Sequence, residues 1–296
     1  MTPAIDPEFD PPFVVAEPTA PAIPFVFNTP HSGASYPASL IAASKLDPTA
    51  LRRSEDAFVD KLFRGVVDLG APLLMAQFPR AYLDVNREPY ELDPRMFDAR
   101  LPSYANSRSM RVAGGLGTIP RIVADGQEIY RAKLSLDEGL RRVERLYKPY
   151  HRKLRHLVHR TARDFGFAIL IDCHSMPSTS IARDDASKID VVLGDRYGTS
   201  CSPVVTDLVE GALQGLGYVV VRNKPYAGGF ITEHYGEPAL GRHALQIEIN
   251  RSLYMDERTM ALKPSFDALA RDLRTTFAMV SRDCPGSLEP PRIAAE

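Results

Sequence analysis

Cysteine is scarce in this sequence of 296 residues, and its three copies lie far apart, at Cys173, Cys201 and Cys284. An odd number of cysteines without any Cys-x-x-Cys pair argues against a disulfide framework and against a zinc ribbon. Unpaired cysteines fit a reducing compartment. We therefore expect a cytoplasmic protein.

Long apolar runs and an excess of one charge are also missing. No stretch approaches the roughly 20 apolar residues that a membrane helix needs. The 36 Lys and Arg residues nearly balance the 37 Asp and Glu residues, and no nucleic-acid-binding signature is present. Asp6, Glu8 and Asp10 stand where a signal peptide would be basic. We therefore expect no export signal, and neither nucleic acid nor a membrane among the partners.

The composition that is present is ordinary for a globular protein, with 44% apolar and 25% charged residues. Six prolines fall within residues 1–23 and predict an extended N-terminal arm. We expect a single catalytic α/β domain over residues 24–283 and a frayed C-terminal tail over residues 284–296.

The segment 167–177 organises the rest of the chain. It begins with apolar and β-branched residues, and its length is typical of a buried strand. The segment then turns polar, and period-two geometry puts Asp172 and His174 on one face and Cys173 on the other. A strand that ends in Asp-x-His brings an imidazole to the carboxyl edge of a sheet, where ligands bind in open α/β folds.

The remaining elements alternate between strands and helices. Strands are predicted over residues 24–31, 73–78, 81–86, 190–195, 218–224 and 244–251. Helices are predicted over residues 48–69, 129–165 with a kink near Pro149, 203–217 and 257–282. This alternation predicts a mostly parallel sheet covered on both faces. Two segments are predicted as irregular: a long insertion over residues 90–128 that covers the site, and a Gly-rich loop over residues 225–236.

Two histidines suggest a metal site. His31 and His174 each close an apolar strand, so both can lie at one edge of the sheet. Hydrolysis at a metal needs a few nitrogen or oxygen ligands, an open position for water and a base. Asp56 and Glu55 are the nearest carboxylates for a third ligand, although acidic residues at a helix start are often simply solvated.

Glu248 is the candidate general base. It lies inside a predicted strand between Ile247 and Ile249. Burying a carboxylate there is costly unless the group is paired or functional. An ion pair with a buried arginine is the competing interpretation.

Three arginines, Arg80, Arg87 and Arg251, follow predicted strand ends. A guanidinium group binds a carboxylate with two parallel hydrogen bonds, so these residues suit an acidic substrate. Together with the histidines and Glu248, they predict an α/β metallohydrolase that acts on an acidic compound. His151 lies on a predicted helix, where it could face either solvent or the interior.

Seven motifs follow one another between residues 24 and 255. They are Thr29-Pro30-His31-Ser32-Gly33, the stretch 56–60, Asp84-Val85-Asn86-Arg87, Pro149-Tyr150-His151, Asp172-Cys173-His174-Ser175, Gly228-Gly229-Phe230-Ile231-Thr232 and Gln246-Ile247-Glu248-Ile249-Asn250-Arg251. In this order they resemble the N-formylglutamate amidohydrolase family. The resemblance implies a three-layer α/β/α sandwich around a central mixed, mostly parallel sheet. Such a fold is similar to that of zinc carboxypeptidases and aspartoacylases, which belong to the phosphorylase/hydrolase-like class.

The same resemblance implies site roles and a cofactor. His31 and His174 would be zinc ligands, Glu248 the general base, and Asn86 and Arg87 part of the substrate pocket. Another divalent metal in place of Zn²⁺ is compatible with these residues.

The third ligand departs from the carboxypeptidase pattern. In zinc carboxypeptidases the first metal-binding motif is His-x-x-Glu. In this sequence the motif begins at His31, and Ala34 occupies the position of the glutamate. Matching the stretch 56–60 to the family's acidic segment favours Asp56, with Glu55 as the fallback.

The expected reaction is metal-dependent hydrolysis of N-formyl-L-glutamate to formate and L-glutamate, in the setting of histidine degradation. The substrate partner would be a small acidic N-acyl amino acid. Three alternatives stay open: a deacylase of another N-acyl amino acid or small peptide, a non-catalytic ligand-binding paralogue, and a cysteine hydrolase that uses Cys173. Alternation along the strand turns Cys173 away from His174, which disfavours the last. The sequence does not predict the oligomeric state.

Overall fold

The computed structural model describes residues 9, 11–123, 126–180, 189–284 and 288. Predictions for residues 1–8 and 10 of the arm, and for most of the tail after residue 284, lie outside these ranges. The chain divides into two compact units. The first unit comprises Met1–Val14, Pro30–Ala57 and Met75–Lys153, and the second comprises Val15–Thr29, Phe58–Leu74 and Leu154–Glu296. The single catalytic domain stays a prediction.

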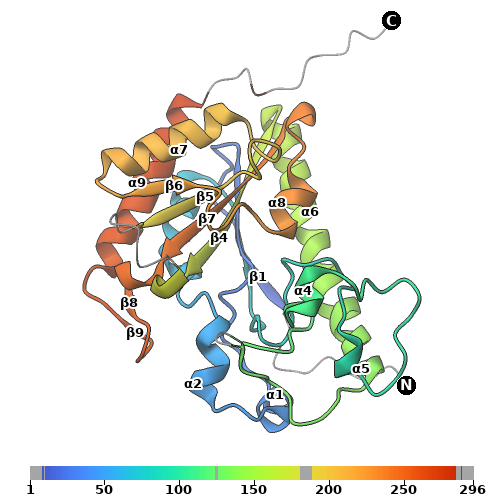
Figure 1. Ribbon diagram of the computed structural model, residues 1–296. Helices are drawn as coiled ribbons and strands as arrows, with labels where there is room; N and C mark the ends of the chain where they lie inside the picture. Colours follow the sequence, from blue (N-terminus) through green and yellow to red (C-terminus); the bar gives the residue numbers. More distant parts are fainter. Residues whose placement is uncertain (1–8, 10, 124–125, 181–188, 285–287, 289–296) are drawn as a thin grey trace, which may run out of the picture. The chain divides into compact units, whose positions relative to one another are not determined.

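A mixed sheet has the strand order β1-β3-β2-β4-β7-β5-β6 (Figure 1). Its strands are β1 Phe13–Ala16, β2 Phe25–Thr29, β3 Leu73–Ala76, β4 Ala168–Met176, β5 Val191–Gly194, β6 Val220–Arg222 and β7 Arg242–Asn250. β2, β4 and β7 run parallel, whereas β5 is antiparallel to β7. The predicted α/β class with a mixed, mostly parallel sheet is confirmed. Strand β1 lies inside the predicted arm, so part of that arm is structured.

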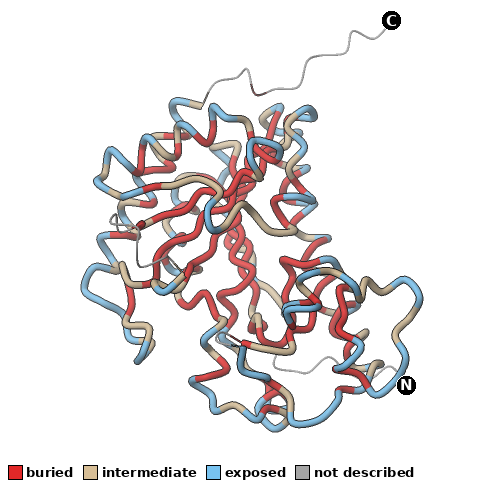
Figure 2. Tube along the Cα trace, in the orientation of Figure 1, coloured by how far each residue is buried: buried red, intermediate tan, exposed pale blue. Residues whose placement is uncertain are grey.

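The two nine-residue strands β4 and β7 form the centre of the second unit. The first half of β4 is apolar, and β4 and nearly all of β7 are buried (Figure 2). Their register pairs Asp172 with Gln246 and His174 with Glu248. Because side chains two residues apart share a face, the polar residues of both strands form two adjacent rows on the sheet.

The helices of the second unit bury the sheet. These elements are α3 Val59–Leu62, the 3₁₀ turn Arg64–Leu69, α7 Pro203–Gly215, α8 Phe230–Tyr235 and α9 Phe266–Asp283. Helices α7 and α9 pack together, whereas α8 packs against β4 and β7 (Figure 1). On α9, Leu269, Leu273 and Phe277 recur at four-residue spacing and are buried. Phe277 meets Phe27 of β2 edge-on, with ring centroids 4.7 Å apart, which fixes α9 on the sheet.

The first unit contains shorter helices. They are α1 Ala38–Ala43, α2 Pro48–Leu51, the 3₁₀ turns Arg52–Ser54 and Pro94–Met96, α4 Met110–Ala113, α5 Leu136–Arg142 and the π-helical turn Val143–Tyr147. Helix α6, Lys148–Phe165, spans the boundary between the units. None of the helices within the described ranges combines the length and apolar character that crossing a membrane requires.

The predicted helix over residues 48–69 is wrong as one element. It breaks over residues 55–58, where Phe58 has a left-handed backbone with φ of 66°. The helix predicted over residues 129–165 begins only at Leu136. Its irregularity near Pro149 is the π-helical turn just before α6, as expected where a proline removes a backbone donor.

Three further predictions need correction. Residues 81–86 form turns rather than a strand, because the backbone N–H of Leu83 bonds to Pro79 and that of Asp84 bonds to Thr118. The Gly-rich loop contains α8. The last helix starts at Phe266, after the hairpin of β8 Met255–Asp256 and β9 Ala261–Leu262. Short 3₁₀ turns cover Ser178–Ser180, Pro238–Leu240 and Arg251–Leu253.

Candidate active site

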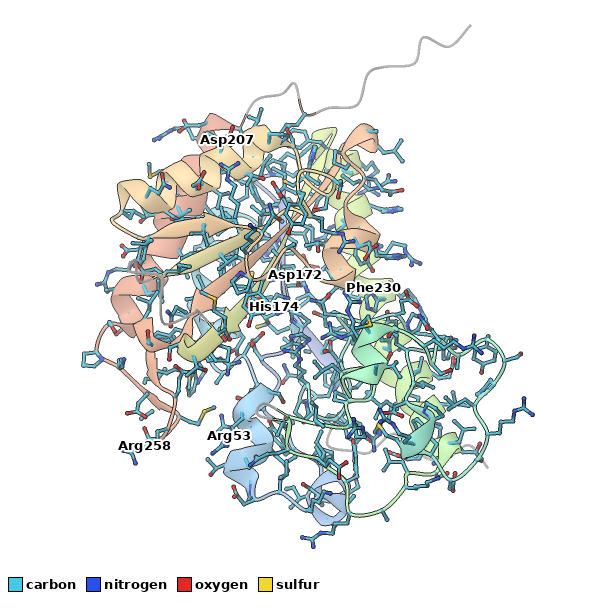
Figure 3. The ribbon with its side chains drawn as sticks, in the orientation of Figure 1. Arg53, Asp172, His174, Asp207, Phe230 and Arg258 are labelled. Atoms are coloured by element: carbon cyan, nitrogen blue, oxygen red, sulfur yellow. The ribbon has the colours of Figure 1, made fainter. Side chains whose placement is uncertain are left out.

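In the second unit, Asp172 and His174 lie side by side on β4, as their spacing predicts (Figure 3). Nε2 of His174 lies 2.9 Å from Oδ2 of Asp172. The side-chain amide of Asn28 on β2 donates to the other carboxylate oxygen at 3.1 Å. Asp172 therefore orients the imidazole, which leaves Nδ1 as the ring nitrogen suited to a metal.

Glu248 lies opposite His174 in the neighbouring strand and is only 8% exposed. The amide Nε2 of Gln246 donates to Oε1 of Glu248 at 3.0 Å. This bond confirms that Gln246 and Glu248 share one face of β7. A hydrogen bond from an amide favours the ionised carboxylate, which is the form that a general base needs.

Arg251 follows β7 and is buried against the end of β4. Its Nε donates to Oγ of Ser175 at 3.1 Å, and Nη2 donates to the carbonyl of Ser175 at 3.5 Å. These bonds hold the guanidinium beside the strand that carries His174. Its substrate-binding role stays a prediction.

In the first unit, His31 is held from two sides. Its Nε2 lies 2.7 Å from Oδ1 of Asp84, and its Nδ1 lies 3.4 Å from Oδ2 of Asp56. The backbone N–H of Asp56 donates to the carbonyl of His31 at 3.0 Å. The break over residues 55–58 makes this contact possible, since a continuous helix would engage that N–H internally.

Asp84 connects His31 to two of the predicted arginines. Its carboxylate accepts hydrogen bonds from Nε of Arg80 at 3.0 Å and from the N–H of Asn86 at 2.8 Å, and Nη2 of Arg87 lies 3.5 Å away. Burial alone would raise the pKa of Asp84, but Arg87, His31 and Arg80 hold that pKa well below its usual range. Sequence reasoning missed this role. An acidic residue among the apolar residues of a predicted strand was the signal.

Arg87 is buried and largely engaged with the protein itself. Its Nε donates to the carbonyl of Leu116 at 2.8 Å, and Nη1 donates to the carbonyl of Asn86 at 2.7 Å. Burial lowers the pKa of Arg87, and the nearby Arg80 and Arg111 lower it further. The two guanidinium groups of Arg80 and Arg87 share the carboxylate of Asp84.

His151 points into the protein, which is one of its two predicted positions. Its Nε2 donates to the carbonyl of Val85 at 2.8 Å, while the hydroxyl of Tyr147 donates to the carbonyl of Arg87 at 2.6 Å. The rings of Tyr147 and His151 lie 4.3 Å apart. The two side chains thus satisfy the backbone of the irregular segment 84–87, which has no strand partner for these carbonyls.

Glu55, the alternative third ligand, has other partners. Arg52 donates to both of its carboxylate oxygens at 2.9 Å, and the hydroxyl of Tyr36 donates to it at 3.1 Å. Burial, together with Glu55, raises the pKa of Tyr36 well above its usual value. The guanidinium of Arg52 balances the negative charge of Glu55, and both carboxylate oxygens of Glu55 already accept hydrogen bonds. Asp56 is therefore the better candidate for metal binding.

All three predicted metal ligands are buried, His31 and Asp56 in the first unit and His174 in the second. Together these residue types could hold a metal ion. Two ligands of a tetrahedral zinc, each about 2.1 Å from the ion, stand about 3.4 Å apart. The 3.4 Å between Nδ1 of His31 and Oδ2 of Asp56 matches that separation. Two imidazoles and one carboxylate are also a ligand set of catalytic zinc sites, so this group could hold a metal.

Comparison with known proteins identifies the family. Residues 23–255 match the family model of N-formylglutamate amidohydrolase. The chain belongs to the N-formylglutamate amidohydrolase family. N-formylglutamate deformylase of Pseudomonas putida is 30% identical over 238 residues, which cover 79% of this chain and 83% of that protein. The protein of the same name from Pseudomonas aeruginosa strain PAO1 is 30% identical over 239 residues, 80% of this chain and 84% of its own.

Solved structures agree with this assignment. The N-formylglutamate amidohydrolase of Ralstonia eutropha JMP134 superposes with a TM-score of 0.86 at 38% identity, covering 92% of this chain and 99% of that one. A gene product of Agrobacterium tumefaciens shares the fold, with a TM-score of 0.62 at 18% identity and coverage of 92% and 95%. The predicted family and fold are confirmed, and the chain is an enzyme of the amidohydrolase class.

The surroundings of Cys173 are unsuited to a nucleophile. Its thiol is fully buried and donates to the carbonyl of Ile171 at 3.5 Å. Burial raises the pKa of Cys173 well above its usual value, and the neighbouring Asp172 raises it further. A thiol that stays protonated is a poor nucleophile, and this disfavours the cysteine-hydrolase alternative.

Proposed function

We propose that this chain hydrolyses the N-formyl amide of N-formyl-L-glutamate in a metal-dependent reaction that releases formate and L-glutamate. The observation that carries the proposal is the buried group of His31, Asp56 and His174 in a chain that belongs to this family. The names of the two Pseudomonas relatives support the substrate. Zn²⁺ is the proposed cofactor because its usual nitrogen and oxygen ligands are those present here.

His31, Asp56 and His174 would hold the ion. Zinc bound by these residues would supply Lewis acidity for the amide carbonyl and would lower the pKa of a water molecule. Asp84 and Asp172 orient the two imidazoles by accepting hydrogen bonds from their Nε2 atoms. Such carboxylates raise the basicity of the ligand histidines and restrict ring rotation.

Glu248 is the proposed general base. It would take a proton from the water as the water oxygen bonds to the formyl carbon. It would then pass that proton to the amide nitrogen as the C–N bond breaks. The register that places Glu248 opposite His174, and the hydrogen bond that its carboxylate accepts from the amide of Gln246, support this role.

The arginines and Asn86 would bind the two carboxylates of the substrate. Arg80 and Arg87, which share the carboxylate of Asp84, would supply the positive charge that attracts an anion. Arg251 would offer a second cation beside β4. A neutral N-formyl amino acid would lack one of these contacts, so we expect an acidic substrate to be preferred.

The cellular setting is also a proposal. Cys173, Cys201 and Cys284 are free thiols, which fits the reducing conditions of the cytoplasm. Hydrolysis of N-formyl-L-glutamate would place the enzyme in histidine degradation.

The test is formate release from N-formyl-L-glutamate by the purified protein, before and after a chelator and after zinc is restored. We expect release that the chelator abolishes and zinc restores, and no release by Glu248→Gln, which should still bind zinc. Release that survives complete metal removal would contradict the metal-dependent mechanism. Full activity of Glu248→Gln would contradict its role as the base.

A further inference from the structure

The side chain of Gln246 connects the proposed base to the segment over residues 225–236. Its Oε1 accepts a hydrogen bond from the backbone N–H of Gly229 at 2.9 Å, and its Nε2 donates to Oε1 of Glu248 at 3.0 Å. A backbone N–H can only donate, and an ionised carboxylate can only accept. The two partners therefore define which end of the amide carries oxygen and which carries nitrogen.

The surroundings of Gln246 hold this side chain in place. Its strand neighbours are Asp172 on β4 and Gly194 on β5. Gly194 has no side chain, and the backbone of Ala227 and Gly228 packs directly over it. A Cβ at that position would lie 2.8 Å from the Gly228 nitrogen. The missing side chain thus lets the Gly-rich turn come close enough for Gly229 to reach Gln246.

Contacts within the Gly-rich turn restrict its conformation. Gly228 has a φ of 121°, which favours glycine, and a Cβ there would lie 2.5 Å from Oγ1 of Thr232. That hydroxyl donates to the carbonyl of Gly229 at 2.9 Å. The N–H of Gly229 consequently has a fixed direction toward β7, just before α8 begins.

We infer that Gln246 is a positioning residue for Glu248 and sets the orientation of the carboxylate through the hydrogen bond to Oε1. The inference rests on the proposed function. A hydrogen bond to one carboxylate oxygen restricts rotation of the group about its Cγ–Cδ bond, and so limits the directions in which the other oxygen can point. A misplacement of about 1 Å in a reacting group can lower the rate on the order of 100-fold.

Two substitutions separate the bond to the base from the bond to the turn. Gln246→Met has similar length and removes both hydrogen bonds. Gln246→Glu keeps an oxygen acceptor for Gly229 but replaces the amide donor by a second carboxylate, which repels an ionised Glu248 at the assay pH. If Gln246 only anchored the turn, the glutamate variant would keep its activity.

The experiment measures kcat and KM for formate release, and the zinc Kd by chelator competition, for both variants and the wild type. We expect kcat to fall about 10- to 100-fold in both variants. The KM and the zinc Kd should stay within about twofold, because neither variant changes a proposed ligand or arginine. A selective fall in kcat is not what a loosened turn or a poorly folded protein would produce.

Two outcomes would overturn the inference. One is a Gln246→Glu variant with wild-type kcat. The other is a loss in both variants that appears equally in KM, zinc Kd and melting temperature, which would indicate a structural role. Failure of the proposed function is distinct, because the wild-type protein would then release no formate.

Discussion

The backbone that carries the proposed catalytic residues is of two kinds, paired β-strands and irregular segments. His174 and Glu248 stand on paired strands, where the ladder of β4 and β7 fixes their backbone positions. His31, Asp56 and the segment 84–87 stand outside regular strands and helices. The regular backbone positions side chains by period alone, whereas the irregular segments depend on side chains that hold one another.

Asp84 illustrates the second kind of support. It contacts His31, Arg80 and Arg87 at once, while its counterpart Asp172 has His174 and Asn28 as described partners. The irregular region therefore concentrates several roles on one carboxylate. We expect substitutions there to affect more properties than equivalent substitutions on the sheet.

The largest expected effect comes from removing a histidine of either region. His174→Ala and His31→Ala should each lose bound zinc and reduce formate release to background, because each removes one of three proposed protein ligands. Metal analysis after dialysis and a formate assay would measure this. His159→Ala, which alters an exposed histidine of α6, is the control. Zinc retained at full stoichiometry in either variant would exclude that histidine as a ligand.

The next effect distinguishes two adjacent carboxylates in the irregular region. Asp56→Asn should lose most of the zinc affinity, whereas Glu55→Gln should retain it. The reason is that Glu55 is already bound by Arg52 and Tyr36. Competition with a chromophoric chelator gives both zinc dissociation constants. The opposite ranking would reassign the third ligand to Glu55.

A smaller effect is expected from the two carboxylates behind the histidines. Asp84→Asn and Asp172→Asn should each weaken zinc binding about 10- to 100-fold, since each removes an orienting carboxylate. Only Asp84→Asn should also raise the KM, because Asp84 also holds Arg80 and Arg87. Equal KM values in the two variants would show that Asp84 contributes no more to substrate binding than Asp172 does.

The smallest expected effect is on stability at acid pH, measured by urea unfolding of the metal-free protein. The pKa of Asp84 is depressed in the folded protein, so the unfolded chain binds its proton more readily. This contribution is therefore complete above the ordinary Asp pKa of about 3.9 and is lost as the pH falls through the depressed value. Asp84→Asn should show a weaker loss of stability below about pH 4. An unchanged slope would contradict the depressed pKa.

The strand-borne part of the site could be predicted from the sequence because its geometry is periodic. An apolar run identified β4 and alternation identified β7, and the two-residue spacing placed Asp172 beside His174 and Gln246 beside Glu248. The sheet, its mixed character and the family followed from the same residues together with the order of the motifs.

The irregular part could be predicted only as a set of candidates. The pattern of residues 48–69 is amphipathic, and nothing local reveals that the helix breaks at Phe58 so that Asp56 can bond to His31. Residues 81–86 resemble a strand by composition, yet they form turns, and His151 and Tyr147 donate to the carbonyls of Val85 and Arg87. Both outcomes depend on residues distant in sequence.

By itself the sequence determined the α/β class, the family, and the face on which each strand residue lies, because these depend on period and on residue type. Only the tertiary structure engaged Glu55 with Arg52 and Tyr36, placed Asp56 and Asp84 beside His31, and joined Gln246 to the Gly-rich turn. Each of these choices is a hydrogen bond or ion pair between segments that come together only when the chain is folded. No local preference of the chain encodes them.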